Sequence, residues 1–240
     1  MEIADKTVLL TGGTAGIGRA LASQLRDAGA TVIVTGRNEA RLEELRSEGF
    51  EALYADLSTV EGVDALVEAW RGRELDILIN NAGMGVTQDY GDGSPNPDES
   101  DAIFYANLSA PVRLTTMLLP LLKARPKATI LNVSSGLAIA PSAKGAVYCA
   151  TKAGLRSFSY SLRADLKGTG VHVIEALPPM VETQMTSDQK GSKMSPEDCA
   201  RAMFEAIRKD KDHAYIGIVG LLNRIHGFSP ALARKVMLNF

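Results

Sequence analysis

Short apolar runs recur along the chain and alternate with segments of helical periodicity. The apolar runs predict strands over residues 6–11, 31–35, 50–55, 75–79, 127–134, 171–177 and 214–219. Between them, apolar residues recur at spacings of three and four, which predicts helices over 19–28, 39–47, 60–71, 97–123, 145–167 and 196–209. Fully apolar strands that alternate with helices are typical of a parallel sheet buried on both faces. The pattern predicts an α/β fold: a doubly wound parallel sheet of about seven strands with helices on both faces.

No repeat, low-complexity tract or linker divides the sequence, so residues 1–240 are predicted to form a single domain. Its amphipathic C-terminal tail, residues 220–240, combines apolar side chains with Arg224, Arg234 and Lys235. A basic amphipathic segment can contact a membrane surface or an apolar substrate. Packing on its own domain or on a partner subunit is more common and is expected here, so membrane contact is not expected.

Composition and charge argue against several classes of function. The net charge of −2 at pH 7 gives no reason to expect a nucleic-acid partner. Two cysteines and three dispersed histidines form neither a disulfide framework nor a metal-ligand spacing, so no metal is expected. The first residues lead into a strand without a signal-peptide pattern, and there is no run of about 18 apolar residues. A cytoplasmic location is therefore expected.

Glycines cluster where the first predicted strand meets the first predicted helix. The segment reads Gly12-Gly13-Thr14-Ala15-Gly16-Ile17-Gly18. A strand, a glycine turn and a helix let backbone N–H groups approach a pyrophosphate at the positive end of the helix. The spacing is G-x-x-x-G-x-G rather than the more common G-x-G-x-x-G, and a turn that merely connects is the alternative. We expect a Rossmann-like dinucleotide site at Gly12, Thr14, Gly16, Ile17 and Gly18.

The second predicted strand ends at Gly36-Arg37-Asn38, where no carboxylate occurs. In dinucleotide folds an acidic residue here binds the ribose 2′-hydroxyl, whereas an arginine accommodates a 2′-phosphate. Arg37 therefore predicts NADP in preference to NAD, and a solvated arginine at the start of the next helix is the alternative. Asp56 and Asn81 follow the third and fourth strands, so they are expected at the same edge of the sheet.

Tyr148 and Lys152 are four residues apart in a predicted helix, so they lie one turn apart on one face. The ordinary phenol pKa of about 10 is too high for proton transfer near neutrality, and a nearby ammonium is expected to lower it. Ser135 follows a predicted strand and brings a hydroxyl to the same point. These three residues predict proton transfer to or from a carbonyl or alcohol oxygen, with a cofactor supplying the hydride.

Pro111 lies inside the predicted helix over 97–123 and lacks the N–H that would bind the carbonyl of Asn107. A kink is expected there, with the Asn107 carbonyl free to hold a water. The alternative is a helix that restarts at Ala110 with Asn107 as its cap. Two polar segments, 84–100 and 184–195, are predicted loops near the substrate, and 184–193 is a candidate lid.

Taken in order, these motifs resemble the short-chain dehydrogenase/reductase family in its single-domain branch. The resemblance extends to about Gly220 and rests on Thr11-Gly12-x-x-x-Gly16-x-Gly18, Asp56-Leu57, Asn80-Asn81-Ala82-Gly83, Asn107, Ser135 and Tyr148-x-x-x-Lys152. It implies that Tyr148 is the acid in reduction and the base in the reverse direction. It implies that Lys152 lowers the tyrosine pKa and binds the nicotinamide ribose, that Ser135 orients the carbonyl, and that Asn107 holds a water linking Lys152 to solvent.

The resemblance also implies a set of cofactor contacts. Asp56 and Leu57 would meet the adenine; Asn81, Ala82 and Gly83 would line the cofactor; Val181 and Thr183 would meet the carboxamide or pyrophosphate. One position departs from the family pattern, since Pro178-Pro179 stands where Pro-Gly is usual. A proline fixes φ and adds bulk, so the nicotinamide pocket is expected to have a different shape.

The predicted activity is hydride transfer between NADP(H) and a small carbonyl or secondary alcohol. A homodimer or homotetramer is expected, because small residues on the helix over 145–167 permit close packing. The alternative is a non-catalytic NAD(P)-binding sensor or scaffold on the same fold. A third interpretation is a membrane-surface enzyme for lipid-like carbonyls, guided by the tail. The sequence predicts neither the substrate nor the physiological direction.

Overall fold

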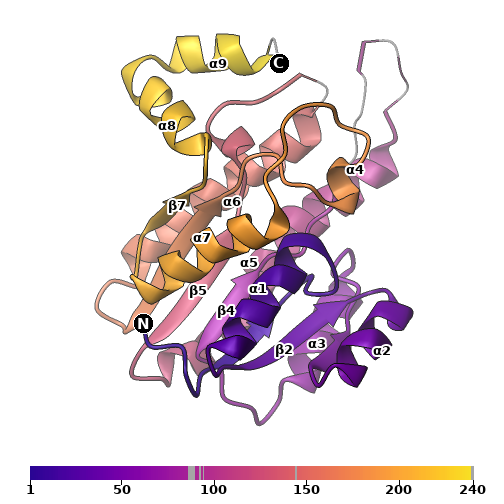
Figure 1. The fold of residues 1–240 in the computed structure, drawn as a ribbon, viewed down its shortest axis with the longest axis vertical. Helices are drawn as coiled ribbons and strands as arrows, with labels where there is room; N and C mark the ends of the chain where they lie inside the picture. The colour runs from indigo at the N-terminus through magenta and orange to yellow at the C-terminus, as the bar shows by residue number, and fades with distance from the viewer. Residues whose placement is uncertain (86–89, 92, 94, 144, 239–240) are drawn as a thin grey trace.

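The structure is a computed structural model that describes residues 1–85, 90–91, 93, 95–143 and 145–238. Its strands are β1 (Thr7–Leu10), β2 (Thr31–Gly36), β3 (Glu51–Tyr54), β4 (Ile77–Asn80), β5 (Ala128–Val133), β6 (Val171–Leu177) and β7 (His213–Tyr215). Within the described residues they form a seven-stranded parallel sheet in the order β3-β2-β1-β4-β5-β6-β7 (Figure 1). The predicted doubly wound parallel sheet is confirmed.

The strand order reverses at β1. Strands β2 and β3 lie on one side of β1, and β4 to β7 lie on the other. Leu9 of β1 pairs with Ile33 of β2 and with Leu78 of β4, which places β1 at the junction. In open parallel sheets the ligand crevice lies at the carboxyl ends of the strands where the order reverses. The glycine segment that follows β1 lies at this point.

Helices connect the strands and cover both faces of the sheet. They are α1 (Gly16–Asp27), α2 (Glu39–Ser47), α3 (Val60–Ala69), α4 (Pro97–Phe104), α5 (Ala110–Lys123), α6 (Ala146–Asp165), α7 (Pro196–Arg208), α8 (Val219–Phe228) and α9 (Pro230–Leu238). Three shorter turns are η1 (Tyr105–Ser109), η2 (Gly136–Ala138) and η3 (Gln184–Thr186). In Figure 1, α1 and α7 lie side by side in front of the sheet.

Alternate residues of the strands face two separate apolar cores. Val8 and Leu10 of β1 pack in one core with Leu21 of α1. Leu9, between them, packs in the other core with Trp70, which ends α3. All five side chains are fully buried. Because burial of one large apolar side chain is worth roughly 1.5–3 kcal/mol, both faces of the sheet contribute to stability, and the strands are apolar throughout.

Two predicted elements differ from the structure. The predicted strand over 214–219 is wrong beyond Tyr215, where β7 ends. Gly217 has a φ of 56°, a left-handed conformation that interrupts the extended chain, and α8 begins at Val219. The predicted helix over 19–28 begins earlier, at Gly16, so the helix starts inside the glycine segment.

The tail forms a helical hairpin of α8 and α9, drawn in yellow at one end of the molecule (Figure 1). Val219, the first residue of α8, packs with Ile139 and Leu177; in the tail itself Leu222 packs against the same cluster and Ala233 is buried. The other side exposes several apolar side chains: Ile218, Leu221, Phe228, Leu232, Val236 and Leu238. In the part of the chain that the structure describes, no helix has the length and apolar character needed to cross a membrane.

Candidate active site

The glycine segment after β1 makes a tight turn directly before α1. Gly12 and Gly16 have φ values of 67° and 53°, which a residue with a side chain rarely adopts. A Cβ on Gly18 would lie 2.2 Å from the carbonyl oxygen of Gly12, so only glycine fits. The first N–H groups of α1 have no partner within the helix and lie at the carboxyl edge of the sheet, where a pyrophosphate can accept from them. The turn therefore fits a dinucleotide.

Asn81 holds this glycine turn against the end of β4. Its Nδ2 donates to the carbonyl oxygens of Thr11 at 2.9 Å and Gly12 at 3.1 Å. The Thr11 hydroxyl accepts from the backbone N–H groups of Asn81 and Ala82, both at 3.0 Å. The structure thus places Asn81 and Ala82 beside the glycine turn, and the Asn81 side chain positions that turn.

Arg37 lies directly after β2 and is exposed. Beyond the end of β3, Asp56 Oδ1 accepts from the Ser58 hydroxyl at 2.7 Å and from the Ser58 N–H at 3.0 Å. The hydrogen bond from the hydroxyl holds the pKa of Asp56 below its ordinary value, and the charge of Arg37 acts in the same direction. Arg37 and Asp56 are therefore electrostatic neighbours at the carboxyl edge, whereas the Leu57 side chain is buried in the core.

Of the other predicted cofactor residues, some contact the glycine turn and others are packed in the core. Thr14 packs against the last residue of β2, because a Cβ on that glycine would lie 2.4 Å from Thr14 Cγ2. Thr183 Cγ2 would lie 2.9 Å from a Cβ on Gly16. Ile17 packs against the core behind the turn, and the Val181 side chain is buried within that core. Thr183 therefore reaches the glycine turn and the Val181 side chain does not; their cofactor contacts stay predictions.

Tyr148 and Lys152 lie one turn apart near the start of α6. Lys152 is only 4% exposed, and its Nζ donates to the carbonyl oxygen of Val133, at the end of β5, at 2.9 Å. The same Nζ lies 5.5 Å from the centroid of the Tyr148 ring. The Ser134 hydroxyl donates to the backbone carbonyl oxygen of Lys152 at 3.1 Å. These contacts fix α6 against β5 and hold the tyrosine and the lysine together.

The pKa of Tyr148 differs from the expectation drawn from the sequence. Burial raises this pKa to about 12, and a hydrogen bond with the Ser135 side chain acts in the opposite direction. Burial lowers the pKa of Lys152 to about 8. The predicted lowering of the tyrosine pKa is therefore wrong for the protein chain by itself, because burial disfavours the charged phenolate more than the hydrogen bond with Ser135 favours it. A phenol that keeps its proton at neutral pH suits proton donation.

Ser135 lies two residues after the end of β5 and is the N-cap of the turn η2. Its Oγ accepts from the Leu137 N–H at 3.2 Å, while the hydrogen bond with Tyr148 brings the two hydroxyls together. The Gly136 N–H donates to the carbonyl oxygen of Pro178 at 3.0 Å. The first of the two consecutive prolines therefore supports the turn that carries Ser135.

Pro111 interrupts the long helix through a π-helical turn. The helix widens over Tyr105–Ser109, and the Ala110 N–H donates to the carbonyl oxygen five residues back. The helix restarts at Ala110, as one alternative predicted, but Asn107 is not its cap. Asn107 is fully buried; its Oδ1 accepts from the Met84 N–H at 2.7 Å, and its Nδ2 donates to the Met84 carbonyl oxygen at 2.8 Å. Asn107 therefore fixes the segment that follows β4.

Asn107 also connects this segment with the residues of α6. A Cβ on Gly83 would lie 3.1 Å from Asn107 Oδ1 and 3.7 Å from Lys152 Nζ, so the chain passes close to both. Asn107 Nδ2 donates to the Thr151 hydroxyl at 3.3 Å, and that hydroxyl donates to the Tyr148 carbonyl oxygen at 2.8 Å. Thr151 is a positioning residue that the sequence motifs did not reveal. The one feature of the sequence that could have indicated this role is the position of Thr151 between Tyr148 and Lys152.

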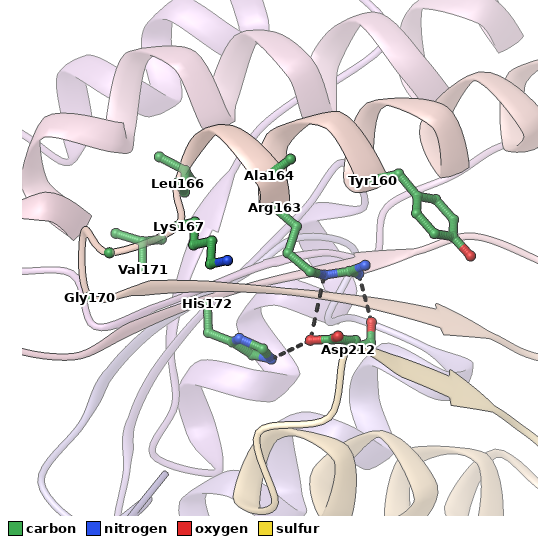
Figure 2. Close-up of a pocket in the computed structure, with 10 residues that line it drawn as sticks. Tyr160, Arg163, Ala164, Leu166, Lys167, Gly170, Val171, His172 and Asp212 are labelled. Carbon is green, nitrogen blue, oxygen red and sulfur yellow. Dashed lines mark hydrogen bonds and ion pairs between the residues drawn. The ribbon is translucent and has the colours of Figure 1, made fainter.

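A cavity of about 600 Å³ lies away from these residues, between the end of α6 and the start of β6. Figure 2 shows Arg163 and His172 pointing toward Asp212. The Arg163 guanidinium donates to the Val173 and Asp212 carbonyl oxygens, both at 2.7 Å, and thus ties α6 to β6 and to the turn before β7. Among the described residues, no three metal-ligand side chains gather anywhere to form an ion site.

A glycine turn at the reversal point of a parallel sheet, beside a tyrosine and a buried lysine, defines a class of protein: oxidoreductases that use a nicotinamide dinucleotide. The sequence model for short chain dehydrogenases matches residues 6–193, and the chain belongs to this family. Over 222 residues it is 38% identical to the oxidoreductase DltE of Bacillus subtilis (strain 168), with 88% of each sequence covered. The resemblance noted in the motifs is confirmed.

Solved structures of this family superpose on nearly the whole chain. A short chain dehydrogenase from Burkholderia cenocepacia J2315, in complex with NADP, has a TM-score of 0.88 at 24% identity and covers 99% of both chains. A 3-ketoacyl-(acyl-carrier-protein) reductase from Brucella melitensis, complexed with NADH, has a TM-score of 0.78 at 30% identity. It covers 85% of this chain and 91% of its own. The dinucleotide bound to the first of these structures carries a 2′-phosphate, and the one bound to the second does not.

Proposed function

We propose that this protein transfers a hydride between NADP(H) and a carbonyl compound or secondary alcohol, with Tyr148 as general acid or base. The observation that carries the proposal is the buried Lys152, held by the Val133 carbonyl oxygen at 2.9 Å and 5.5 Å from the Tyr148 ring centroid. A lysine is seldom buried this fully, and a charge kept in such a place is characteristic of functional sites.

The cofactor, when bound, supplies the hydride, and the chain supplies position and the proton. Tyr148 holds its proton at neutral pH because burial raises its pKa to about 12. It donates this proton to the carbonyl oxygen, while the Ser135 hydroxyl orients the same oxygen. The Lys152 ammonium stabilises the phenolate that proton donation leaves behind. Asn107 keeps the Met84 backbone fixed beside them.

The preference for NADP rests on Arg37 at the end of β2. An exposed guanidinium beside Asp56, with no acidic residue at the strand end, favours a 2′-phosphate over a free hydroxyl pair. Arg37→Ala should raise the dissociation constant for NADPH by about 10- to 100-fold, the loss of one charge-assisted contact. The constant for NADH should change less than about threefold. Arg201→Ala, on the surface of α7, is the control, and equal effects on both cofactors would reject the preference.

Turnover is tested by NADPH consumption with a panel of ketones, aldehydes and quinones. Consumption that depends on one of these carbonyl classes supports the oxidoreductase. Tight NADPH binding without turnover of any member of the panel would instead favour the non-catalytic sensor or scaffold.

A further inference from the structure

The segment after β4 and the turn η3 meet directly over Tyr148. A Cβ on Gly85 would lie 3.1 Å from both Cγ and Sδ of Met185, and 4.0 Å from Cδ2 of Tyr148. Gly85 is therefore in van der Waals contact with the Met185 thioether on one side and close to the catalytic ring on another. Met185 belongs to η3, far from Gly85 in sequence, and remains 45% exposed.

Both sides of this contact are held by hydrogen bonds. On one side, Asn107 binds the N–H and the carbonyl of Met84, which fixes the residue directly before Gly85. On the other side, the Thr186 hydroxyl donates to the Val181 carbonyl oxygen at 2.5 Å, directly after Met185. The thioether is thus placed by its neighbours, although the side chain itself is long, flexible and unbranched.

Two cations near η3 already bind groups of η3 and of the residue that follows it. Lys193 Nζ donates to the carbonyl oxygens of Thr186 at 2.6 Å and Ser187 at 3.4 Å. Arg41 Nη2 donates to Gln184 Oε1 at 3.2 Å. The side chain of η3 that contacts Gly85, close to Tyr148, is therefore the neutral thioether of Met185. Its neighbours Gln184 and Thr186 bind Arg41 and Lys193.

Behind the turn η2, which Ser135 caps, the chain packs into a small apolar cluster. Ile139, which follows η2, is buried with Leu177 and Val219. A Cβ on Gly136 would lie 2.9 Å from Val219 Cγ2, so α8 closes directly on this turn. A charged substituent packed against the neutral thioether would lose part of its hydration, which is unfavourable.

We propose that Met185 is a specificity-determining residue and that the site takes carbonyl compounds with an uncharged, apolar substituent, which packs against the Met185 thioether. This inference rests on the proposed function. In the reduction, the hydride adds to the carbonyl carbon, the Tyr148 proton adds to the oxygen, and the products are the alcohol and the oxidised cofactor. The substituent undergoes no chemistry; its contact with Met185 sets which carbonyl is held beside Tyr148.

Two aldehydes of similar length test this inference: pentanal, which is neutral, and succinic semialdehyde, which carries a carboxylate. The wild-type protein should have a kcat/KM for pentanal about 100-fold above that for succinic semialdehyde. Met185→Lys should reduce this ratio by at least about tenfold, because the new ammonium pairs with the carboxylate. Met117→Lys, at an exposed position of α5, is the matched control and should leave the ratio unchanged.

A double-mutant cycle isolates the contact between Gly85 and Met185. Gly85→Ala adds a methyl group 3.1 Å from the thioether and should lower kcat/KM for pentanal about tenfold. In the Met185→Ala background the same substitution should have little effect, with NADPH affinity unchanged throughout. A wild-type preference for succinic semialdehyde, or an unchanged ratio in Met185→Lys, would overturn this inference while leaving the oxidoreductase intact. Failure of the wild type to reduce any carbonyl would overturn the proposed function itself.

Discussion

The buried lysine makes the stability of this protein depend on pH in a way that one substitution removes. Burial lowers the pKa of Lys152 from 10.5 to about 8. Between these two values the unfolded chain, whose lysine has its ordinary pKa, binds more protons than the folded chain. The free energy of unfolding therefore gains a contribution that rises with pH across this window. Lys152→Met should abolish that rise.

The size of the effect follows from the two pKa values of Lys152. One pKa unit corresponds to about 1.4 kcal/mol, so the buried charge costs roughly 3 kcal/mol at pH 7 and roughly 1 kcal/mol at pH 10. Relative to the variant, the wild type should gain roughly 2–3 kcal/mol in its free energy of unfolding over this range. Loss of the hydrogen bond to Val133 shifts the stability of the variant by an amount that is the same at each pH, so it cancels. Measurements stop at pH 10 because Tyr148, with a pKa raised to about 12, contributes in the opposite direction above that value.

The assay is urea unfolding of the wild type, Lys152→Met and Lys167→Met at four pH values from about 7 to about 10. Lys167 is exposed, so its variant controls for the removal of a lysine and should follow the wild type. Parallel pH dependences of the wild type and Lys152→Met would refute the reasoning, since they would mean that the lysine is not desolvated.

Other substitutions test how the site is built. Asn107→Ala should lower the free energy of unfolding by about 2–4 kcal/mol in urea titrations, because two buried backbone groups lose their partner. Gly18→Ala should abolish NADPH binding in a fluorescence titration, since its Cβ would lie 2.2 Å from a carbonyl oxygen. Gly227→Ala, in α8 with no heavy atom within 4 Å of the new Cβ, should instead raise the free energy of unfolding by up to about 1 kcal/mol. We also propose that the exposed small residues of α6 form a subunit contact, so Ala153→Arg should reduce the mass measured by light scattering, and an unchanged mass would argue against that contact.

The sequence predicted the sheet well because its physical cause is local and repeated. Strands buried on both faces must be apolar throughout, and each of the predicted runs overlaps with an observed strand. The error at β7 also has a local cause: residues 216–219 are apolar, but Gly217 turns the chain and the following residues enter α8. Composition alone does not distinguish a short strand that leads into a helix from a longer strand.

The site was predicted in part, and the missing part depends on tertiary contacts. Proline chemistry predicted an interruption before Pro111, yet the π-helical turn and the Asn107 contacts with Met84 require the segment after β4 to lie alongside. Likewise, the spacing of Tyr148 and Lys152 predicted their proximity but not the pKa of the tyrosine. Burial decides that pKa, and the degree of burial is a property of the folded chain.

The central claim is that Tyr148 donates the proton that accompanies hydride transfer. The most direct test follows the fluorescence of NADPH bound to the wild type and to Tyr148→Phe, before and after addition of a carbonyl substrate found in the panel. The two proteins should bind NADPH within about threefold of each other, because the phenol hydroxyl is expected to act on the substrate oxygen. The decay of the NADPH signal should be about 100- to 10,000-fold slower in the variant. A variant that binds NADPH and consumes it at close to the wild-type rate would contradict the account.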